Sequence, residues 1–221
     1  MTRRSRLLTT ATAGVTAALL LAGCGGGDGG KSKSNDKIAG ADTGASASAS
    51  ASPSASASEA AGRPKLDMPS DLSYTFEWPQ TGNADKDEVL ADSEQSIKAV
   101  DLAIVHQDAL DKVYLYYYEG EAAAGTQKFI QNYVDHKASI TGAYRFYSPD
   151  VAVSKDGTAS LSYCEDQGKA FVKYLKTNEI RKTKVTAKSY VIYHTSLKKN
   201  TKGVWVIEKI ISQIGSAECQ P

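Results

Sequence analysis

Long apolar segments are scarce in this chain of 221 residues. The longest one, Leu7–Leu21, is short and rich in Ala and Thr, and no stretch after residue 24 is apolar enough to cross a bilayer. The chain also lacks a phosphate-cradling glycine loop, a zinc-ligand spacing, a nucleophile elbow around a serine and an internal repeat. These absences argue against a polytopic membrane protein and leave no recognisable nucleotide-binding, zinc or serine-hydrolase chemistry.

The first residues have the order of a secretory signal peptide. Met1-Thr2-Arg3-Arg4-Ser5-Arg6 is a positive n-region and Leu7–Leu21 an apolar h-region. The run ends in Leu21-Ala22-Gly23-Cys24, which resembles the bacterial lipoprotein box, where the cysteine takes a diacylglycerol and becomes the first residue of the mature protein. We expect residues 1–23 to be a lipoprotein signal peptide. The alternative is an ordinary secreted protein with a chance cysteine near the cleavage site.

Charge gives little indication of a polyanionic partner. The formal net charge of the whole chain is +1, with 26 basic and 25 acidic residues. A signal peptide would remove Arg3, Arg4 and Arg6, which lowers the basic count to 23 and makes the mature chain slightly acidic. Neither nucleic acid nor an anionic membrane surface is therefore an expected partner of the chain as a whole. Contact with the membrane is expected through the lipid on Cys24, with palmitate among its acyl chains.

Cysteine is rare, and its count is informative. If Cys24 carries lipid, then Cys164 and Cys219 remain as a pair, which an oxidising extracytoplasmic compartment would join as a disulfide. Two free thiols or a metal-binding pair are the alternatives, although neither cysteine has His or carboxylate partners at a short metal-ligand spacing.

Residues 24–66 have the composition of a linker. They are mostly Gly, Ser, Ala, Asp and Lys, with an Ala-Ser alternation over Ala45–Ser58 that only Pro53 interrupts. Such a segment has too few apolar side chains to form a core and is expected to be disordered, either as an unmodified spacer or with O-glycosylation. Residues 67–221 then form one domain with one core.

Helical patterns come first in this domain. Asn83 can cap a helix over Asp85–Val105, whose apolar residues recur at helical spacing. A shorter segment over Leu110–Tyr118 has the same spacing and predicts a second helix, although its tyrosine-rich part also suits a strand. A third helix begins between Gly120 and Gly125 and ends before Gly142.

After Gly142 the period of apolar residues changes to two, which predicts strands. Turn residues at 155–157, 167–168, 177–178 and 199–200 separate five of them. The predicted strands are Ala143–Val153, Thr158–Asp166, Ala170–Leu175, Val185–Leu197 and Val204–Gln213. Three helices followed by five strands predict an α+β fold in which N-terminal helices pack on a curved antiparallel sheet.

The order of elements over Val89–Cys219 resembles the nuclear transport factor 2-like superfamily, whose cone-shaped domains include ketosteroid isomerase. Three segments resemble, more narrowly, small lipoproteins of high-GC Gram-positive bacteria with this fold behind a tether. These segments are Asp156–Asp166, Gly203-Val204-Trp205-Val206 and Gly215–Cys219. That group usually has Asp-Cys-x-Asp after Asp-Gly, whereas Tyr163 replaces the first acid here.

This resemblance implies where a site would lie. Superfamily members that catalyse use an acid or a His–Asp pair inside the cone, assisted by tyrosines. The acid and base candidates are His106, His136, His194 and Asp101. A pocket, if present, is expected to have a mostly apolar and aromatic wall, drawn from Tyr114, Tyr117, Phe129, Tyr190, Ile192, His194 and Trp205. No catalytic residue, metal or cofactor is assigned.

One basic cluster stands out, formed by Arg181-Lys182-Thr183-Lys184 and Lys188. It falls in a loop between two predicted strands, where it is either a solvated hairpin tip or a contact for an anionic cell-wall polymer or lipid head groups.

Two hypotheses about function follow. The first is a surface-tethered domain that binds a small apolar ligand or a partner protein without catalysis. The second is a lyase- or isomerase-like enzyme that uses the same cavity. Convergence of at least two titratable groups with perturbed pKa values in one pocket would favour the second. The ligand, the partner and the oligomeric state are not encoded in any motif.

A single substitution tests the lipid anchor. Because the thiol of Cys24 is the acylation site of a lipoprotein, Cys24→Ser should move the protein from the membrane fraction to the medium or leave it unprocessed. Mass spectrometry of the wild-type N-terminal peptide checks the chemistry directly. A mature protein that starts elsewhere, or a Cys24 without acyl mass, would exclude the lipoprotein interpretation.

Overall fold

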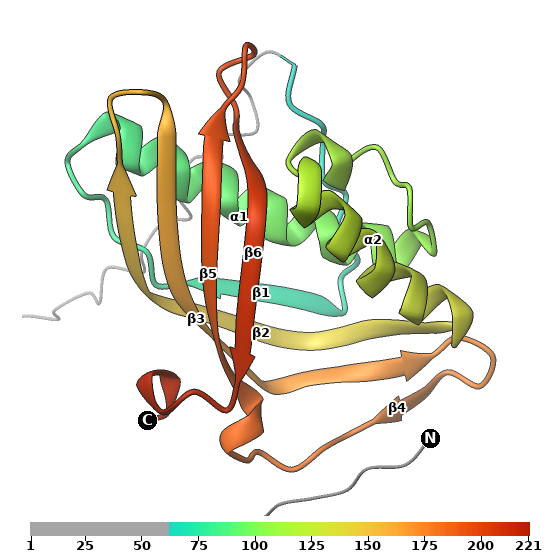
Figure 1. Ribbon diagram of the computed structural model, residues 1–221. Coiled ribbons are helices and arrows are strands. Elements are labelled where there is room, and N and C mark those ends of the chain that lie inside the picture. Colours follow the sequence, from blue (N-terminus) through green and yellow to red (C-terminus); the bar gives the residue numbers. More distant parts are fainter. Residues whose placement is uncertain (1–61) are drawn as a thin grey trace, which may run out of the picture. The chain divides into compact units, whose positions relative to one another are not determined.

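A computed structural model describes residues 62–221 (Figure 1). The expected signal peptide, Cys24 and nearly all of the linker lie outside the described residues. In the part that is described, no helix is long and apolar enough to span a membrane.

Two α-helices agree with the prediction. α1 spans Ala84–His106, and the Asn83 side chain accepts a hydrogen bond from the Lys86 N–H at 3.1 Å, as an N-cap does. α2 spans Gly120–Asp135. The Asn83 cap marks the start of α1, whereas the N-cap position of α2, Glu119, makes no side-chain cap hydrogen bond. The sequence alone located both ends of α1 within two residues.

The helix predicted over Leu110–Tyr118 is wrong. This segment holds only a short 3₁₀ turn, η2, over Tyr114–Tyr116. The carboxylates of Asp108 and Asp111 accept hydrogen bonds from backbone N–H groups two residues ahead, at 2.8 and 2.7 Å, which favours local turns over a helix. Tyr118 then forms a β-bridge with Ile207. At the end of the segment, the backbone is therefore extended, as in the strand that was the alternative prediction.

The sheet has six strands in the order β1-β2-β3-β5-β6, with β4 paired to β3. It is mixed rather than wholly antiparallel, because β1 runs parallel to β2. The bounds are β1 Leu72–Phe76, β2 Ala138–Val153, β3 Thr158–Tyr174, β4 Glu179–Arg181, β5 Tyr190–Lys199 and β6 Trp205–Ile214. β5 begins five residues later than predicted, after a 3₁₀ turn, η3, over Ala187–Ser189.

The turn predicted at Gln167-Gly168 is a bulge inside one long strand. The register passes from Arg145 opposite Asp166 to Ala143 opposite Lys169, so β3 carries one more residue than β2 across this step. The Gly168 N–H donates a hydrogen bond to the Asp166 carboxylate at 2.8 Å. Asp and Gly make the same local bond in turns, so the sequence pattern predicted a turn here.

Two glycines allow the strands to approach at this bulge. A Cβ on Gly142, which has φ +108°, would lie 2.2 Å from the carbonyl oxygen of Lys169. A Cβ on Gly168 would lie 2.9 Å from the Asp166 carboxylate. A bulge of this kind bends a strand and increases its twist, and β2 and β3 are the long bent strands of the curved sheet (Figure 1).

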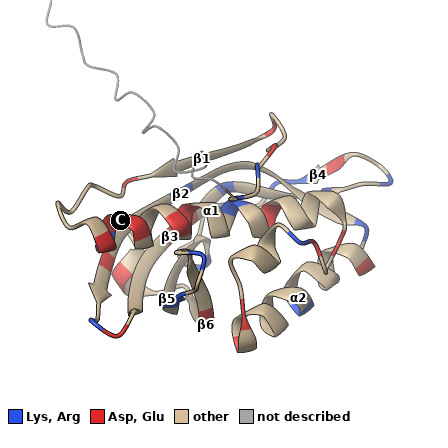
Figure 2. Ribbon diagram, turned by 90° about the horizontal axis from the view of Figure 1, so that it is seen from above, with Lys and Arg blue, Asp and Glu red and all other residues tan. Residues whose placement is uncertain are grey.

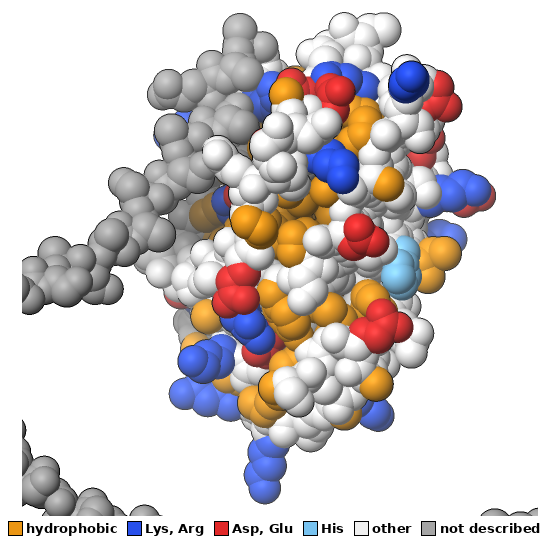
Figure 3. Space-filling view, turned by 90° about the vertical axis from the view of Figure 1, so that its left-hand side faces the viewer, with side chains coloured by type: hydrophobic (Ala, Val, Ile, Leu, Met, Phe, Trp, Pro, Cys, Tyr) orange, Lys and Arg blue, Asp and Glu red, His pale blue; other side chains and the backbone are white. Residues whose placement is uncertain are grey.

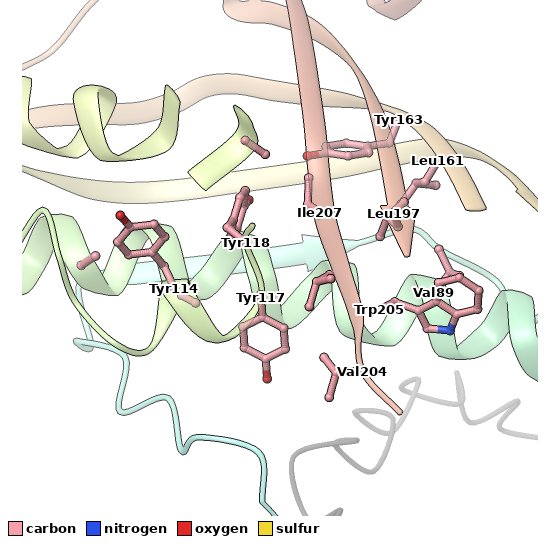
Figure 4. Close-up of a cluster of buried hydrophobic side chains, with 14 of the residues drawn as sticks. Val89, Tyr114, Tyr117, Tyr118, Leu161, Tyr163, Leu197, Val204, Trp205 and Ile207 are labelled. Carbon is pink, nitrogen blue, oxygen red and sulfur yellow. The ribbon is translucent and has the colours of Figure 1, made fainter. Parts of the chain in front are cut away.

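The helices cover one face of this sheet, and the core lies between the two layers (Figures 1 and 4). Val89 of α1, Tyr117 and the β6 residues Trp205 and Ile207 are among the fully buried side chains. The opposite, outer face carries the chain end, where η4, Ala217–Cys219, packs against β3 and β5.

A buried ion pair fixes the start of the described chain. Asp92 of α1 is fully buried and accepts hydrogen bonds from the Arg63 guanidinium at 2.7 and 2.9 Å. Its second oxygen accepts a hydrogen bond from the backbone N–H of Trp205 at 2.9 Å. Burial raises the pKa of Asp92, whereas the bonds from Trp205 and Arg63 lower it. Contacts of the domain thus include Arg63, a residue that composition assigned to the linker.

Cys164 of β3 and Cys219 of η4 form a disulfide, with Cα atoms 5.5 Å apart. The bond lies on the outer face in a small apolar cluster with Ile192, against which Tyr147 and Tyr190 pack. The Tyr147 hydroxyl also donates a hydrogen bond to the carbonyl oxygen of Cys219. The structure therefore confirms the pairing that the cysteine count predicted.

Removing this crosslink should destabilise the domain without unfolding it. The disulfide closes a loop of 55 residues, and the chain-entropy relation then gives a loss of about 4 kcal/mol for the double variant Cys164→Ala/Cys219→Ala. Urea unfolding of the variant and the oxidised wild type measures this difference. If both proteins unfold at the same urea concentration, the disulfide does not contribute to the stability of the domain.

Candidate functional site

Four of the seven residues expected to line a pocket lie in or beside the helix layer. Tyr114, Tyr117 and Trp205 are fully buried members of the main core (Figure 4). Phe129 is 51% exposed on α2, where it stacks edge-on against Tyr133. These side chains fill the core or reach solvent and do not surround one cavity.

The three expected pocket residues from β5 point to the outer face of the sheet, away from the helices. Tyr190 and Ile192 pack around the disulfide on the outer face. His194 shares their face, is exposed, and has its Nδ1 2.8 Å from the hydroxyl of Ser162. The inward residues of β5 are their neighbours, and because side chains alternate along a strand, an error of one residue exchanges the two faces. A pair between His194 and Asp101 is therefore excluded.

The other two histidines lie near the surface. His106 is half exposed and has its Nδ1 2.6 Å from an Asp111 carboxylate oxygen. His136 is exposed, with its Nδ1 2.7 Å from the Asn132 carbonyl oxygen. Both contacts are local to a helix end. The His106–Asp111 contact is a His–acid pair, but it joins residues five apart at the end of α1 and includes neither Asp101 nor His194.

Asp101, by contrast, lies in a group of polar side chains against the inner face of the sheet. We call this group the acid–tyrosine cluster. Six elements contribute one residue each, namely Tyr74 of β1, Asp101 of α1, Tyr133 of α2, Tyr144 of β2, Glu165 of β3 and Tyr193 of β5. Asp101 and Glu165 are close enough that their charges raise the pKa of Tyr133, Tyr144 and Tyr193, after the larger effect of burial.

Strand register explains how the sequence assembles this cluster. Tyr74 lies opposite Tyr144 in the parallel pair of β1 and β2, and the two rings stack with centroids 5.9 Å apart. Tyr163 lies opposite Tyr193 in the pair of β3 and β5, and these rings stack at 5.1 Å. Glu165 follows Tyr163 by two residues and therefore lies on the same inner face.

The carboxyl group of Asp101 has an unusual acidity. Burial raises its pKa to about 8, a hydrogen bond from the Tyr74 hydroxyl at 2.8 Å lowers it, and the charge of Glu165 raises it again. Because this pKa exceeds 7, Asp101 holds a proton at neutral pH for most of the time. One carboxyl oxygen of Asp101 accepts the hydrogen bond from the Tyr74 hydroxyl. The other oxygen, when it carries the proton, can donate a hydrogen bond.

Glu165 differs from Asp101 in its surroundings. Burial raises its pKa, whereas hydrogen bonds from Gln167, at 2.8 Å, and from Tyr193 lower it. Only 6% of Glu165 is exposed, whereas Asp101, Tyr74 and Tyr144 are half-buried residues. Glu165 is therefore the more enclosed residue of the two acids.

Glu165 is the functional candidate that the sequence interpretation missed. It stands within the segment that carried the family resemblance, between the disulfide cysteine and Asp166. The alternation of side chains along a strand could have identified Glu165. Cys164 faces the disulfide on one side of β3, so the next residue, Glu165, must face the core on the other side.

Other features of the surface carry no comparable site. Two surface hollows, one along α2 between Ala124 and Asp135 and one beside Lys112 and Lys202, share no residue with the acid–tyrosine cluster. Within residues 62–221, no group of three His, Cys, Asp or Glu side chains is arranged to hold a metal ion. On the face shown in Figure 3, apolar side chains at the surface alternate with charged ones, as on most folded domains.

The raised pKa of Asp101 predicts a pH-dependent stability. Between the ordinary value of 3.8 and the raised value of about 8, the folded state holds a proton that the unfolded state releases, so stability falls as pH rises through this window. Asp101→Asn needs no proton. We expect the Tm of the variant to exceed that of the wild type by about 15 °C at alkaline pH and to approach it under acidic conditions.

Calorimetry across this pH range makes the comparison, with exposed Asp150→Asn as the control that should follow the wild-type profile. Parallel profiles for Asp101→Asn and the wild type would mean that Asp101 titrates normally.

No protein-family model matches the sequence, and no curated protein matches it either. Solved structures with a similar fold do exist. A ketosteroid isomerase-like protein from Erwinia carotovora atroseptica aligns with 61% of this chain and 98% of its own, at 13% identity and a TM-score of 0.41. A putative aromatic ring hydroxylase from Novosphingobium aromaticivorans aligns with 58% and 88%, at 12% identity and a TM-score of 0.40.

An NTF-2 like protein of unknown function from Shewanella oneidensis covers 56% of this chain and 98% of its own length, at 15% identity and a TM-score of 0.36. Likeness at this level carries no argument about ligand or reaction. The functional argument therefore rests on the residues of the acid–tyrosine cluster, in a domain of two helices packed on a curved, mixed six-stranded sheet.

Proposed function

We propose that this protein is a lipoprotein, held at the extracytoplasmic face of the cell membrane by Cys24, whose domain binds a small and mostly apolar ligand without transforming it. The ligand would carry a carbonyl or another hydrogen-bond acceptor and would bind at the acid–tyrosine cluster. The tether rests on the order of n-region, h-region and Leu21-Ala22-Gly23-Cys24, followed by the Gly/Ala/Ser-rich linker.

A single observation supports the binding function, namely a carboxylic acid on a half-buried residue, Asp101, that is neutral at pH 7 and lies beside aromatic rings. A neutral acid donates a hydrogen bond, and in partly desolvated surroundings such a bond discriminates strongly for a ligand acceptor. Tyr74 and Tyr144, whose rings stack on each other, offer an aromatic surface to an apolar or aromatic skeleton. Few polar groups on an aromatic wall are typical of a small-molecule site.

A proton-transfer enzyme is the second candidate. It is favoured by the raised pKa of both Asp101 and Glu165, since two carboxyl groups with shifted pKa values suit a general acid and a general base. Binding without catalysis is preferred because Glu165 is enclosed and already hydrogen-bonded to Gln167 and Tyr193. Glu165 is therefore less available to a bound molecule than Asp101. Acid–base catalysis by this pair would need both carboxyl groups at the reacting atoms of the substrate.

Binding of an aromatic ketone, 2-acetylnaphthalene, tests this proposal by fluorescence titration. Affinity should fall as pH rises through about 8, because Asp101 then loses the proton that it donates. Asp101→Leu removes the donor at every pH and should weaken binding about tenfold, the worth of one hydrogen bond in a partly desolvated site. The exposed substitution Glu121→Gln is the matched control.

Affinity that is indifferent to pH and to Asp101→Leu would reject the acid–tyrosine cluster as the site. Exchange of the ketone's methyl protons with deuterated water, followed by NMR, separates the two functions. Exchange that requires Asp101 and Glu165 would establish the enzyme, whereas binding without exchange supports the ligand-binding domain.

A further inference from the structure

One end of the sheet follows the bulge in β3. It comprises residues 169–188, which include the end of β3, a turn at 175–178, β4 and the return segment to η3. We call it the basic arm. Its part of β3 pairs with β2 on one side and with β4 on the other, and β4 pairs only with β3 (Figure 1, orange, lower right).

Charge on the basic arm is strongly one-sided. It carries seven basic residues, Lys169, Lys173, Lys176, Arg181, Lys182, Lys184 and Lys188, and a single acid, Glu179. The rest of residues 62–221 has an excess of seven acids, with 20 acidic and 13 basic residues. Figure 2 shows Lys and Arg on the ribbon around β4. A domain that is almost neutral in total is therefore polarised.

Most of this positive charge is not neutralised within the domain. Lys173 pairs with Asp71 at 3.1 Å. The salt bridges found among residues 62–221 include none of the other six basic side chains of the arm. Uncompensated cations on one arm favour an anionic partner.

Apolar side chains share a face with two lysines of the arm, whereas Arg181, which lies opposite Val172, points to the other face. Lys169, Phe171 and Lys173 alternate along β3, and Leu175 continues the alternation one residue past its end, so these side chains point to one side. Lys173 lies opposite Ile180 of β4, which joins this side. The side is the outer one, because the intervening Val172 lies opposite Ile140, a member of the core.

Exposure of the apolar residues is considerable. Leu175 is 39% and Ile180 42% exposed, and Val185 of the return segment is 56% exposed. Phe171 is half-buried. A surface that only bound phosphate groups of a soluble polymer would need the lysines but not these apolar neighbours. A membrane interface takes both, because cations meet the lipid phosphates while apolar groups enter the head-group region.

We infer that the basic arm docks on a membrane surface that contains anionic lipids. This contact is separate from the acid–tyrosine cluster and does not depend on acylation of Cys24. It would orient the domain with its sheet edge toward the bilayer.

Vesicle sedimentation tests the inference with the chain from residue 24 onward carrying Cys24→Ser, so that no acyl chain contributes. The protein should sediment with vesicles of mixed phosphatidylcholine and phosphatidylglycerol, less so at raised salt, and not with phosphatidylcholine alone. The triple variant Lys169→Gln/Lys182→Gln/Lys184→Gln should lose about fivefold in partition for each lysine removed. All three positions are exposed, and an unchanged Tm verifies folding.

The matched control removes the same charge elsewhere, with Lys112→Gln/Lys128→Gln/Lys155→Gln at exposed positions outside the arm. It should sediment like the unsubstituted chain, and an equal loss in both triple variants would overturn the inference. Leu175→Ser/Ile180→Ser should weaken vesicle binding with the charge intact. If this variant binds vesicles normally and free poly(glycerol phosphate) binds the arm as tightly as vesicles do, the partner is an anionic polymer and the membrane inference fails.

Discussion

The bulge at Gln167-Gly168 is the constraint on which both the candidate site and the basic arm depend. Before it, the odd-numbered residues of β3, including Tyr163 and Glu165, face the helices. After it, the odd-numbered residues face outward, because the extra residue inverts the alternation. One inserted residue thus places Glu165 inside the domain and Lys169 and Lys173 outside it, on the same strand.

Gly142 and Gly168 make this inversion sterically feasible, since a side chain at either position would meet backbone or carboxylate atoms at less than 3.0 Å. The curvature that follows encloses Asp101 between α1 and the inner face of the sheet. Desolvation within that enclosure, more than any single charged neighbour, sets the acidity of the acid–tyrosine cluster. Backbone geometry at two glycines is therefore linked to the chemistry of a carboxyl group on another element.

The sequence predicted what local physics controls. The Asn83 cap and the apolar periodicity located α1, and the hairpin turns at 155–157, 177–178 and 199–200 coincide with strand ends. The cysteine pair followed from arithmetic alone. Leu110–Tyr118 was mistaken because helical spacing competed there with aspartate turns and with a distant backbone partner, Ile207, which no local pattern reveals.

The site was harder to predict, since it depends on strand faces and register. Asp101 was named from the sequence, but His194 was assigned to the inner face of β5 although its neighbour Tyr193 occupies that position. Glu165 was missed because the bulge two residues later was interpreted as a turn, which hid the continuity of β3. Turn chemistry and bulge chemistry use the same residues, so only the pairing with β2 distinguishes them.

The contact between Arg63 and Asp92 has a mechanical consequence. Tension that arrives along the chain from residues ahead of 63 reaches this ion pair before it reaches β1. Asp92 belongs to α1 and accepts a hydrogen bond from the Trp205 N–H at the start of β6, so the force is distributed over both elements. Both Asp92 and Trp205 are buried in the interior of the domain. The short edge strand β1, whose bonds to β2 could be peeled one at a time, is shielded, so a pull from the N-terminal side is resisted by the packed interior of the domain.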